Sequence, residues 1–475
     1  MGFLVEQVWH GNPGAFRARD RRGGRFNAYV PHPLRGWHPL LPADMAASVA
    51  AAENELRDTA IAARGDGAGM FFWAESLGSS RIEGVAPGTK KVVHALARRQ
   101  RTPDRDFHGP VGEVLANIDA TTTALDLLAD REHISIATLQ KAHRVLMDAS
   151  PTPHLGGRIR DEQNWVGGND WHPLEGDFIP PPPEHCDPLL EDLVSYLRVE
   201  DHSPLLQATI AHAQFETIHP FGDGNGRTGR AVLYAVLKHR LCGTQPAALP
   251  PISLALSRDR DAYIAALAAY QTYVGPADAP ARAEALGPCA EALATASHRA
   301  CAAVRRYTEA MVALRDRWRE AAGGRRGRSA VSAAIDCLPA HPSLTPSALS
   351  GITGYSEPRA AAALRHLEAA GVVKARTVET GMRVYDADQV FNAYEVMAST
   401  ICDKRASADD YANIVASPLI SAPAQPLRPT GRRQQGVSPW ELCPLSVKST
   451  GLPCGLKAGH QGHCRQIPHR KHPPR

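Results

Sequence analysis

The side chains best suited to chemistry lie together in one short stretch of the chain. Three glycines, Gly222, Gly224 and Gly226, let backbone N–H groups converge on one point. Arg227 and Arg230 are three residues apart, so both would lie on one face of a helix that begins here. The positive N-terminal end of that helix adds to the same field. The pattern therefore predicts a cradle for a polyphosphate.

Two more residues of this stretch, which runs from His219 to Arg230, could supply chemistry. Asp223 offers a hard carboxylate oxygen to Mg²⁺, which usually binds through one or two carboxylates together with phosphate oxygens. His219 is the residue of the stretch that can take up a proton near neutral pH. The alternative is a glycine-rich surface loop beside a solvated basic face. The fixed offsets of His, Asp, Asn and Arg around three glycines disfavour that alternative.

Apolar residues on both sides of the stretch predict the elements that position it. They recur at helical spacing within Leu205–Ala213 and again within Val232–Leu237. The local structure should therefore be a helix, a tight loop and a second helix. Helical patterns also cover most of Leu41–Leu96, Val111–Ser150 and Ala281–Glu320. We predict a mainly α protein.

The stretch resembles the signature of the Fic family, His-Pro-Phe-x-(Asp/Glu)-Gly-Asn-Gly-Arg-x-x-Arg, at every defined position. Similar features extend over roughly Leu41–Tyr270. In that family the fold is a helical bundle with one small β-hairpin, called the flap. The resemblance implies an enzyme that transfers AMP from ATP, with Mg²⁺, to a Ser, Thr or Tyr hydroxyl of a target protein.

The resemblance also implies a role for each residue of the signature. His219 is the general base on the target hydroxyl, Asp223 holds Mg²⁺, and Arg230 binds the γ-phosphate. Phe221 is the apolar anchor of the loop, and Asn225 and its flanking glycines bind the α- and β-phosphates with help from Arg227. The complete set of nucleotide-binding positions is Phe221, Gly222, Asp223, Gly224, Asn225, Gly226, Arg227, Thr228, Gly229 and Arg230.

A second constellation, Ser79–Gly84, closes a predicted helix far upstream. Taken alone, Glu83 is most simply a solvated helix end, and Gly84 suits a helix C-terminus. The segment resembles the Fic inhibitory motif, (Ser/Thr)-x-x-x-Glu-(Gly/Asn), with Ser79, Glu83 and Gly84 at its defined positions. The resemblance implies that Glu83 pairs with Arg230, replaces the γ-phosphate and leaves the enzyme self-inhibited. We expect an exposed ion pair whose loss leaves folding stability nearly unchanged.

Turn-forming residues within Val166–Pro183 predict the β-hairpin flap. The alternative is an irregular Pro/Gly loop. In the Fic family an extended segment of the target pairs with the flap edge. The resemblance thus implies that a target protein docks on residues 166–183, and that backbone pairing reads little of its sequence.

Composition and pattern divide the chain into successive parts. We predict an N-terminal helical region with the inhibitory motif (1–110), a Fic catalytic core (111–275) and a helical connector (276–328). A winged helix-turn-helix (329–400), a linker (401–438) and a Cys/His tail (439–475) follow. The linker has little to bury because it is rich in Pro, Ser, Gln and Arg.

The layout of Ala330–Tyr385 predicts the winged helix. Thr345 and Pro346 start one helix as N-cap and first residue, Ser356–Ala370 forms the next, and two short extended segments follow. The basic residues expected to face outward are Arg359, Arg365 and His366. They would suit contact with DNA phosphates. A protein-binding or purely structural module is the alternative, because the net charge of the segment is unremarkable.

Thiol and imidazole groups gather in the tail, where there is almost no apolar core. A segment this small needs a staple, and these groups favour tetrahedral Zn²⁺. The candidate ligands are Cys443, Cys454, His460, His463 and Cys464. A disordered basic tail is the alternative.

Overall composition bounds the remaining choices. The chain has 475 residues, a net charge of +4 and nine cysteines. This charge does not by itself indicate a nucleic-acid binder, and the cysteines do not form a disulfide framework. No apolar run approaches a membrane span and the first residues lack a signal core. We expect a cytoplasmic protein with no membrane partner.

Other functions stay open beside AMP transfer. The same fold could remove AMP or transfer a phosphate, or it could be the nucleotide sensor of a DNA-binding transcriptional regulator. The intact Gly224-Asn225-Gly226 with Arg230 favours AMP transfer. The expected partners are ATP, the target protein, DNA through the winged helix, and a second copy in a homodimer.

Overall fold

The computed structural model describes most of the first 419 residues. The described ranges are 2–15, 17–63, 68–101, 107–168, 171–243, 247–324, 329–379, 382–402 and 409–419. They belong to one compact unit, 1–422. The proposed zinc ligands Cys443, Cys454, His460, His463 and Cys464 lie outside the described residues.

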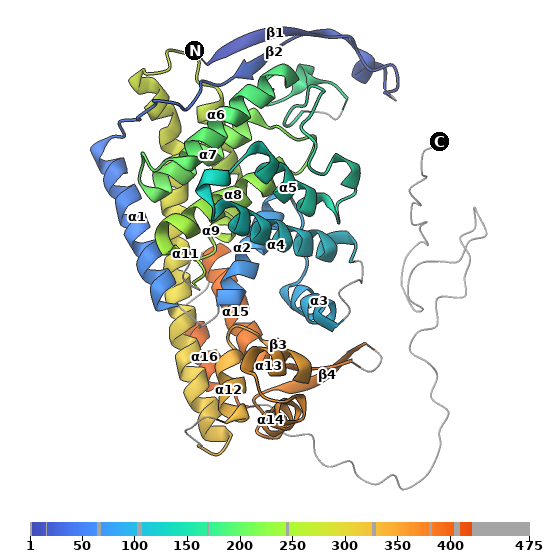
Figure 1. Cartoon of the computed structure of the whole chain (residues 1–475), viewed down its shortest axis with the longest axis vertical. Helices are drawn as coiled ribbons and strands as arrows, with labels where there is room; N and C mark the ends of the chain where they lie inside the picture. The colour runs from blue at the N-terminus through green and yellow to red at the C-terminus, as the bar shows by residue number, and fades with distance from the viewer. Residues whose placement is uncertain are drawn as a thin grey trace, which may run out of the picture. The chain divides into compact units, whose positions relative to one another are not determined.

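The fold is mainly helical, as predicted (Figure 1). The helices before the candidate loop are α1 (Ala43–Ala62), α2 (Ala68–Ile82), α3 (Thr89–Arg101), α4 (Gly109–Leu128), α5 (Ile136–Met147), α6 (Cys186–Arg198) and α7 (Pro204–Ile218). Those after it are α8 (Asn225–Cys242), α9 (Ile252–Leu256), α10 (Arg260–Gln271), α11 (Pro280–Ala321), α12 (Ala330–Cys337), α13 (Pro346–Thr353), α14 (Glu357–Ala369), α15 (Asp388–Cys402) and α16 (Asp409–Ala416).

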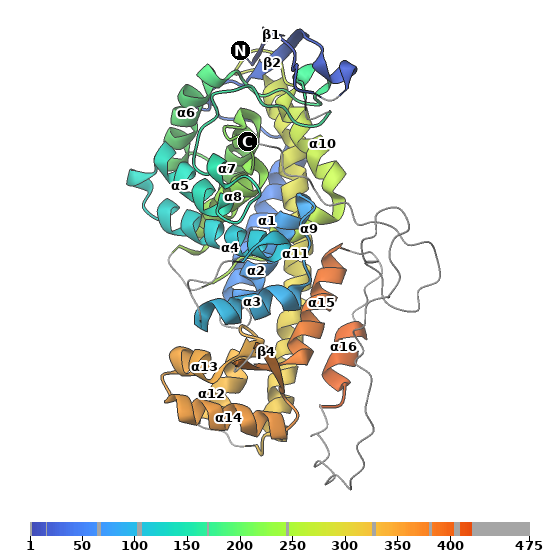
Figure 2. The same ribbon diagram turned by 90° about the vertical axis from the view of Figure 1, so that its right-hand side faces the viewer.

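Helices α7 and α8 form the centre of the bundle. They pack against each other, with α4 and α5 on one side and α1 and α11 on the other (Figures 1 and 2). Nearly every residue of α7 is buried, including its polar ones. A helix that is apolar around most of its circumference belongs in a core. The loop between α7 and α8 is therefore attached at both ends to rigid, buried helices.

Two strands lie within the first thirty residues, and the sequence pattern did not reveal them. Strand β1 (Phe3–Trp9) pairs antiparallel with β2 (Gly24–Val30) in a two-stranded sheet. The expectation of a helical region from residue 1 to 110 is wrong for this part. Both strands are interrupted by charged and polar residues that obscure their alternation. The hairpin is held in place by the Tyr29 N–H, which donates to the Ile179 carbonyl at 2.9 Å.

The flap is less regular than predicted. Within 166–183, the described residues contain one antiparallel bridge, between Val166 and Phe178, and a short 3-10 helix at Pro173–Glu175. The turn-forming residues and prolines interrupt ladder pairing before two full strands can form. One flank of the flap is covered by the N-terminal hairpin, because Tyr29 packs against Phe178.

The segment after α11 contains helices and a small sheet. Strands β3 (Ser343–Leu344), β5 (Met382–Asp386) and β4 (Lys374–Glu379) lie in the order β3-β5-β4. Thr345 caps α13, since its side chain accepts from the Ala348 N–H at 3.1 Å. This arrangement supports the winged-helix interpretation, which remains a prediction.

Helix α16 departs from the expected boundaries, and helix α3 contacts the segment expected to be the winged helix. Helix α16 falls within the part expected to be a linker, where the apolar side chains Tyr411 and Ile414 are buried. Helix α3 contacts both α4 and strand β3 (Figure 1). In the part of the chain that the structure describes, no helix is both long and apolar enough to span a membrane.

Candidate active site

The loop between α7 and α8 turns sharply at two residues. His219 ends α7 in the left-handed region, with φ 49° and ψ 57°. It is the only non-glycine residue with positive φ in the described ranges. Gly224, with φ 75°, precedes the first residue of α8. A side chain held in this region costs about 1–3 kcal/mol, so the surrounding structure must enforce the conformation of His219.

Segment 159–164 supplies that enforcement through hydrogen bonds to the loop carbonyls. The Arg160 side chain donates from Nε to the His219 carbonyl at 2.9 Å, and its backbone N–H donates to Pro220 O at 2.9 Å. Asn164 Nδ2 donates to the carbonyls of His219, at 3.1 Å, and Phe221, at 3.0 Å. These contacts orient the loop backbone without entering the cradle.

Asn225 shapes the loop with its side chain. Its Oδ1 accepts from the Phe221 N–H at 2.9 Å, and its Nδ2 donates to the Phe221 carbonyl at 2.8 Å. Both polar groups of this buried amide are thus used within the loop. The phosphate-binding role implied for Asn225 stays a prediction, and its backbone N–H at the start of α8 is a further donor suited to an anion.

Phe221 packs into the core next to the loop, and its implied role as the apolar anchor stays a prediction. Its ring is fully buried and stacks on His143, with centroids 3.7 Å apart. His143 Nδ1 accepts from the Gly157 N–H, so Nε2 carries the proton and donates to the Asp223 carbonyl at 2.9 Å. Burial lowers the pKa of His143 to about 4, which keeps this ring neutral. Sequence reasoning missed His143, because a lone histidine on a helix carries no motif.

The ring nitrogens of His219 have separate roles. Its Nδ1 contacts the Glu216 carbonyl at 3.2 Å. A carbonyl can only accept, so Nδ1 carries the proton and Nε2 is left as the basic nitrogen. Burial lowers the pKa of His219 to about 4, against a smaller opposing effect of the Glu216 carbonyl. His219 is therefore neutral and able to accept a proton near pH 7.

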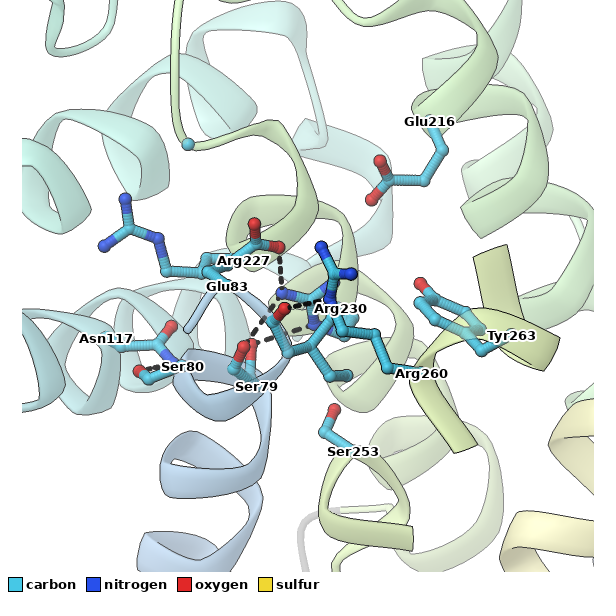
Figure 3. Close-up of polar contacts among 12 residues, drawn as sticks. Ser79, Ser80, Glu83, Asn117, Glu216, Arg227, Arg230, Ser253, Arg260 and Tyr263 are labelled. Carbon is cyan, nitrogen blue, oxygen red and sulfur yellow. Dashed lines mark hydrogen bonds and ion pairs between the residues drawn. The ribbon is translucent and has the colours of Figure 1, made fainter. Parts of the chain in front are cut away.

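Arg230 joins the two constellations that the sequence singled out, as Figure 3 shows. Its Nε donates to Ser79 Oγ at 3.0 Å, and its Nη2 donates to the Ser79 carbonyl at 3.0 Å. The same Nη2 donates to Glu83 Oε1 at 2.7 Å. The predicted contact between Glu83 and Arg230 is thus present. Gly84, with φ 81°, turns the chain away immediately afterwards.

The ion pair is less exposed than predicted. The Arg230 side chain is 2% exposed and the Glu83 side chain 39%. Burial alone would raise the pKa of Glu83, but the charge of Arg230 and its hydrogen bond outweigh burial and lower it. The expectation of an exposed pair is wrong on the arginine side, because tertiary packing of α8 against α2 encloses the guanidinium.

The end of α2 is fixed to two other helices. Asn117 on α4 donates from Nδ2 to the Ser76 carbonyl at 2.8 Å and to Ser80 Oγ at 3.1 Å. Arg260 on α10 donates from Nε to the Ile82 carbonyl at 2.7 Å. These contacts determine where the carboxylate of Glu83 lies.

Arg227 is a buried cation, and within the described part of the chain not all of its hydrogen-bond donors have a partner. Its Nη1 lies 3.6 Å from Glu113 Oε2 on α4. Among the described residues, its Nε and Nη1 are buried without a hydrogen-bond partner. Such orphaned donors are costly unless a ligand satisfies them, so Arg227 fits contact with an anion.

A cavity of about 330 Å³ opens above the loop. Of the predicted site residues, those that line it are Glu83, His219, Gly222, Asp223, Gly224, Asn225, Gly226, Arg227 and Arg230. Phe221, Thr228, Gly229, Ser79 and Gly84 do not line it. Thr228 and Gly229 are buried in α8, and a Cβ at Gly229 would lie 2.5 Å from Glu216 Oε1. These two positions serve close helix packing.

Of the cavity-lining residues outside both motifs, three have ionisable side chains: Glu216, Arg260 and Tyr263. The spacing of Ser257 and Tyr263 resembles a Ser-then-Tyr spacing that follows the signature in the Fic family. This signal could have pointed to Tyr263. No sequence signal distinguishes Glu216 or Arg260 from other charged residues on a helix. Only the tertiary packing of α7 and α10 brings them to the cavity.

Asp223 fits the chemistry of a magnesium ligand. Its side chain is exposed, and it accepts from the Gly224 N–H at 2.6 Å and from Thr152 Oγ1 at 3.1 Å. These two bonds orient the carboxylate and leave lone pairs for a cation. Within the described residues, no three His, Cys, Asp or Glu side chains group as a metal centre. Mg²⁺ does not need one, since it takes the remaining oxygens from phosphates and water.

Comparison with known proteins identifies the central part of the chain. Residues 133–237 match the model of the Fic/DOC family. The chain is similar to protein adenylyltransferase fic-1 of Caenorhabditis elegans, with 37% identity over 129 residues, 26% of this chain and 23% of the relative. It is also similar to protein adenylyltransferase Fic of Drosophila melanogaster, with 32% identity over 126 residues, 26% of this chain and 23% of the relative. The matched segments thus cover about a quarter of these curated relatives.

Solved structures also align with parts of the chain. A Fic family protein from Desulfovibrio desulfuricans aligns with 21% identity and a TM-score of 0.39, over 74% of this chain and 98% of that one. Fic-1 from C. elegans aligns with 23% identity and a TM-score of 0.40, over 57% of this chain and 73% of that one. The assignment itself rests on the family match over 133–237, which contains α7, the loop and most of α8. The chain therefore carries a domain of the Fic/DOC family.

Proposed function

We propose that this chain is a protein adenylyltransferase that transfers AMP from ATP to a Ser, Thr or Tyr hydroxyl of a target protein. The observation that carries the proposal is the pairing of a base and a phosphate partner in one cavity. His219 presents a free Nε2, and Arg230 lies buried on the wall of the same cavity. The names of the similar curated proteins support this activity.

The reaction is a displacement at the α-phosphorus. His219 Nε2 takes the proton of the target hydroxyl while its oxygen forms the new bond to phosphorus. The bond to the bridging oxygen of pyrophosphate breaks, and pyrophosphate leaves with the electron pair. Backbone N–H groups at the start of α8, together with Arg227, face the charge that develops on the phosphate oxygens. Mg²⁺, held by Asp223, would neutralise part of that charge.

Glu83 restrains this reaction in the proposal. It occupies Nη2 of Arg230 and places a negative charge where the γ-phosphate would bind. ATP can then enter only with its triphosphate displaced, so that the α-phosphorus is not aligned with the incoming hydroxyl. Alignment matters because a small error in geometry can cost about 10²-fold in rate.

The target protein would dock beside the flap. A cavity of about 550 Å³ lies next to the loop and is lined by residues 158–165 and Gly222. Trp165 lines both this cavity and the one above the loop, so the two adjoin at the flap. An extended segment lying here would bring a hydroxyl towards His219.

Transfer of label from ATP tests the function directly. The protein, with Glu83→Gly to remove the restraint, is incubated with Mg²⁺ and ATP labelled at either the α- or the γ-phosphate. Label on protein from the α-phosphate alone supports AMP transfer. Label from the γ-phosphate would instead indicate phosphotransfer. Absence of transfer, with specific DNA binding by the full chain, would favour the nucleotide-sensing regulator and overturn the proposal.

A further inference from the structure

The carboxyl group of Glu216 lines the cavity but has no part in the mechanism above. Glu216 lies on α7, three residues before His219, and is 6% exposed. It shares the cavity wall with Glu83 and Arg230 (Figure 3). Among the described residues, its Oε1 is buried without a hydrogen-bond partner. A buried carboxyl in this state is costly when ionised, so its environment calls for an explanation.

Except for Arg260, the groups that α7 and α10 place near Glu216 are not cations. His212 Nδ1 lies 4.0 Å from Oε1, and His212 Nε2 is bonded to the Tyr263 hydroxyl at 2.6 Å. Burial lowers the pKa of His212 to about 3, so this ring is neutral. Gln271 donates to the backbone carbonyl of Glu216 and not to its side chain.

The groups that face it from α8 and α2 are charged. The carboxyl lies directly against the backbone of α8 at Gly229, where a Cβ would be 2.5 Å from Oε1. The next residue is Arg230, whose charge favours the ionised form of Glu216, while the charge of Glu83 opposes it. Arg260 also lines the cavity, but its Nε is bonded to the end of α2.

A triphosphate bound in this cavity would change the electrostatic environment of the Glu216 carboxyl. It would bring several negative charges to Arg230, inside an enclosed space where charges interact strongly. An ionised Glu216 would then repel the ligand and compete for the arginine. Burial raises the pKa of Glu216 to about 7, so both of its forms are present near neutral pH. The protonated form carries an O–H that can donate to the ligand.

We propose that Glu216 is a proton-dependent binding residue of the nucleotide pocket: protonated, it admits a triphosphate beside Arg230, and ionised, its negative charge competes with the ligand for the field of Arg230 and opposes binding. The inference rests on the proposed function only in that the cavity holds a nucleoside triphosphate. Binding then takes up one proton. Above the pKa of Glu216, affinity for ATP falls as pH rises, by up to about tenfold per pH unit for a single linked proton.

Equilibrium binding of Mg²⁺-bound, non-hydrolysable ATP analogue tests this across roughly pH 6–8.5, where a terminal phosphate and Glu216 both titrate. The variants are Glu83→Gly and Glu83→Gly with Glu216→Gln or Glu216→Asp. Glutamine mimics the protonated acid, so its variant should bind at pH 8 several-fold more tightly than Glu83→Gly, with a smaller pH slope. Aspartate keeps the carboxyl and should keep the slope.

The ligand's own titration is common to all variants, so the difference between slopes is the measurement. Equal slopes for Glu83→Gly and its Glu216→Gln derivative would overturn the proposal. Equal affinity of these two variants at low pH shows that the substitution has not damaged the fold. If the slope difference appears without any AMP transfer, the binding role stands and the proposed enzymatic function fails.

A different observation concerns the segment that follows Glu83. Helix α3 is tied to the end of strand β5 by a fully buried carboxylate, Asp386. Asp386 accepts from His94 Nε2 at 2.9 Å and from Ser343 Oγ at 2.8 Å, and Arg376 Nε lies 3.0 Å away. Lys90, also on α3, is bonded to Asp388 at the start of α15.

A second contact lies on the other side of Glu83. Arg81 Nη1 lies 3.3 Å from Cys402 Sγ at the end of α15. The inhibitory carboxylate thus stands between two attachments to the same C-terminal segment, residues 343–402. We infer that this segment holds the end of α2, and with it Glu83, in the position that restrains the reaction. This inference also rests on the proposed function.

Loosening the attachment should release the restraint. Self-modification is the transfer of AMP to hydroxyl groups of the protein itself. Lys90→Ala and His94→Ala should each raise its rate, measured with α-labelled ATP, several-fold. Neither substitution should increase the rate of Glu83→Gly further. Arg383→Ala, which breaks an exposed pair with Glu368 on the same segment, is the matched control and should change nothing. Unchanged rates in both α3 variants would refute the inference. If the variants were merely unstable, they would lower the Glu83→Gly rate instead.

Discussion

At the scale of single residues, many polar groups of the loop are already hydrogen-bonded within the protein, and few are left to act on a ligand. His219 is held in a left-handed conformation, and its Nδ1 is committed to the Glu216 carbonyl. The Asn225 side chain makes two hydrogen bonds within the loop. Within the signature, the groups that face the cavity are the Nε2 of His219, the Asp223 carboxylate and the guanidinium groups of Arg227 and Arg230. Each of these has a distinct chemical role, so each can be tested by one substitution.

Replacing the base should stop chemistry without stopping binding. In the Glu83→Gly background, His219→Ala should lower the rate of AMP transfer by about 10²–10⁴-fold, the usual contribution of general acid–base catalysis. Affinity for ATP should change little, because His219 acts on the incoming hydroxyl. Transfer and nucleotide binding are measured on the same preparations. Substantial residual transfer would show that another group is the base.

The pH profile gives an independent check on the same residue. The pKa of His219 is lowered to about 4. The histidine acts as a base only when unprotonated, so it stays competent as pH falls from neutrality and is lost near its own pKa. With saturating ATP, transfer by Glu83→Gly should therefore persist to roughly pH 5. A decline centred on the ordinary histidine pKa, roughly 6.5, would contradict the assignment.

Asp223 should determine the requirement for the metal. Asp223→Ala should abolish AMP transfer at any Mg²⁺ concentration, because the carboxylate that holds the ion is gone. Asp223→Glu keeps a carboxylate that the family signature accepts, and it should retain transfer with a shifted Mg²⁺ dependence. Titration of Mg²⁺ in both variants measures this. Full activity of Asp223→Ala would mean that the ion is held elsewhere.

At the scale of elements, the site depends on the contact between the end of α2 and helix α8. The end of α2 carries Glu83, and α8 carries Arg230, which also donates to Ser79. Asn117 and Arg260 fix the end of α2 from two other helices. The proposed restraint would thus be a property of how these helices pack, and it should be removable by changing one carboxylate.

Glu83→Gly should raise self-modification by about 5- to 150-fold, the usual range of coupling between two sites. Arg230 is then free to bind the γ-phosphate. Arg230→Ala should not be activated by Glu83→Gly, so the two changes should be strongly non-additive in a double-mutant cycle. Rates with α-labelled ATP in all four variants measure this. Equal rates in wild type and Glu83→Gly would reduce the motif to a helix end.

The same substitution should lower stability modestly. Arg230 is 2% exposed and loses a partner, but Ser79 still accepts from it, and Glu83 itself is 39% exposed. The cost should lie between those of an exposed and a fully buried pair, about 1–2 kcal/mol. Chemical denaturation of both proteins measures the difference. This replaces the expectation, made from the sequence, that stability would be nearly unchanged.

At the scale of the whole molecule, the Fic/DOC match covers residues 133–237, and elements on both sides complete the site. Helix α2 precedes the match and α10 follows it, yet Glu83, Arg260 and Tyr263 all line the cavity. The N-terminal hairpin covers one flank of the flap. Several residues that line the pocket therefore lie well outside the matched segment.

The Cys/His tail lies outside the described residues and remains a prediction about the intact chain. Purified protein should contain about one Zn²⁺ per chain, given the four-ligand geometry of structural sites. Truncation before Trp440 should remove the metal and leave AMP transfer by Glu83→Gly measurable. Elemental analysis of both proteins decides it. Metal-free native protein would eliminate the zinc module.

The sequence by itself determined the chemistry of the loop and the class of fold. The spacing of His219, Asp223 and Arg230 is local, and the periodicity on either side requires helices that hold it. Local patterns of this kind survive folding because they arise from neighbours along the chain. The contact of Glu83 with Arg230, 147 residues apart, was reached only through a family resemblance.

Tertiary structure decided what surrounds that loop. The β-hairpin at residues 3–30 and helix α16 gain their stability from packing, which short and polar-interrupted patterns do not reveal. The burial of Arg230, the stacking of His143 on Phe221 and the orphaned carboxyl of Glu216 depend on helices far apart in the sequence. Protonation and charge in the pocket follow from burial, and burial exists only in the folded chain.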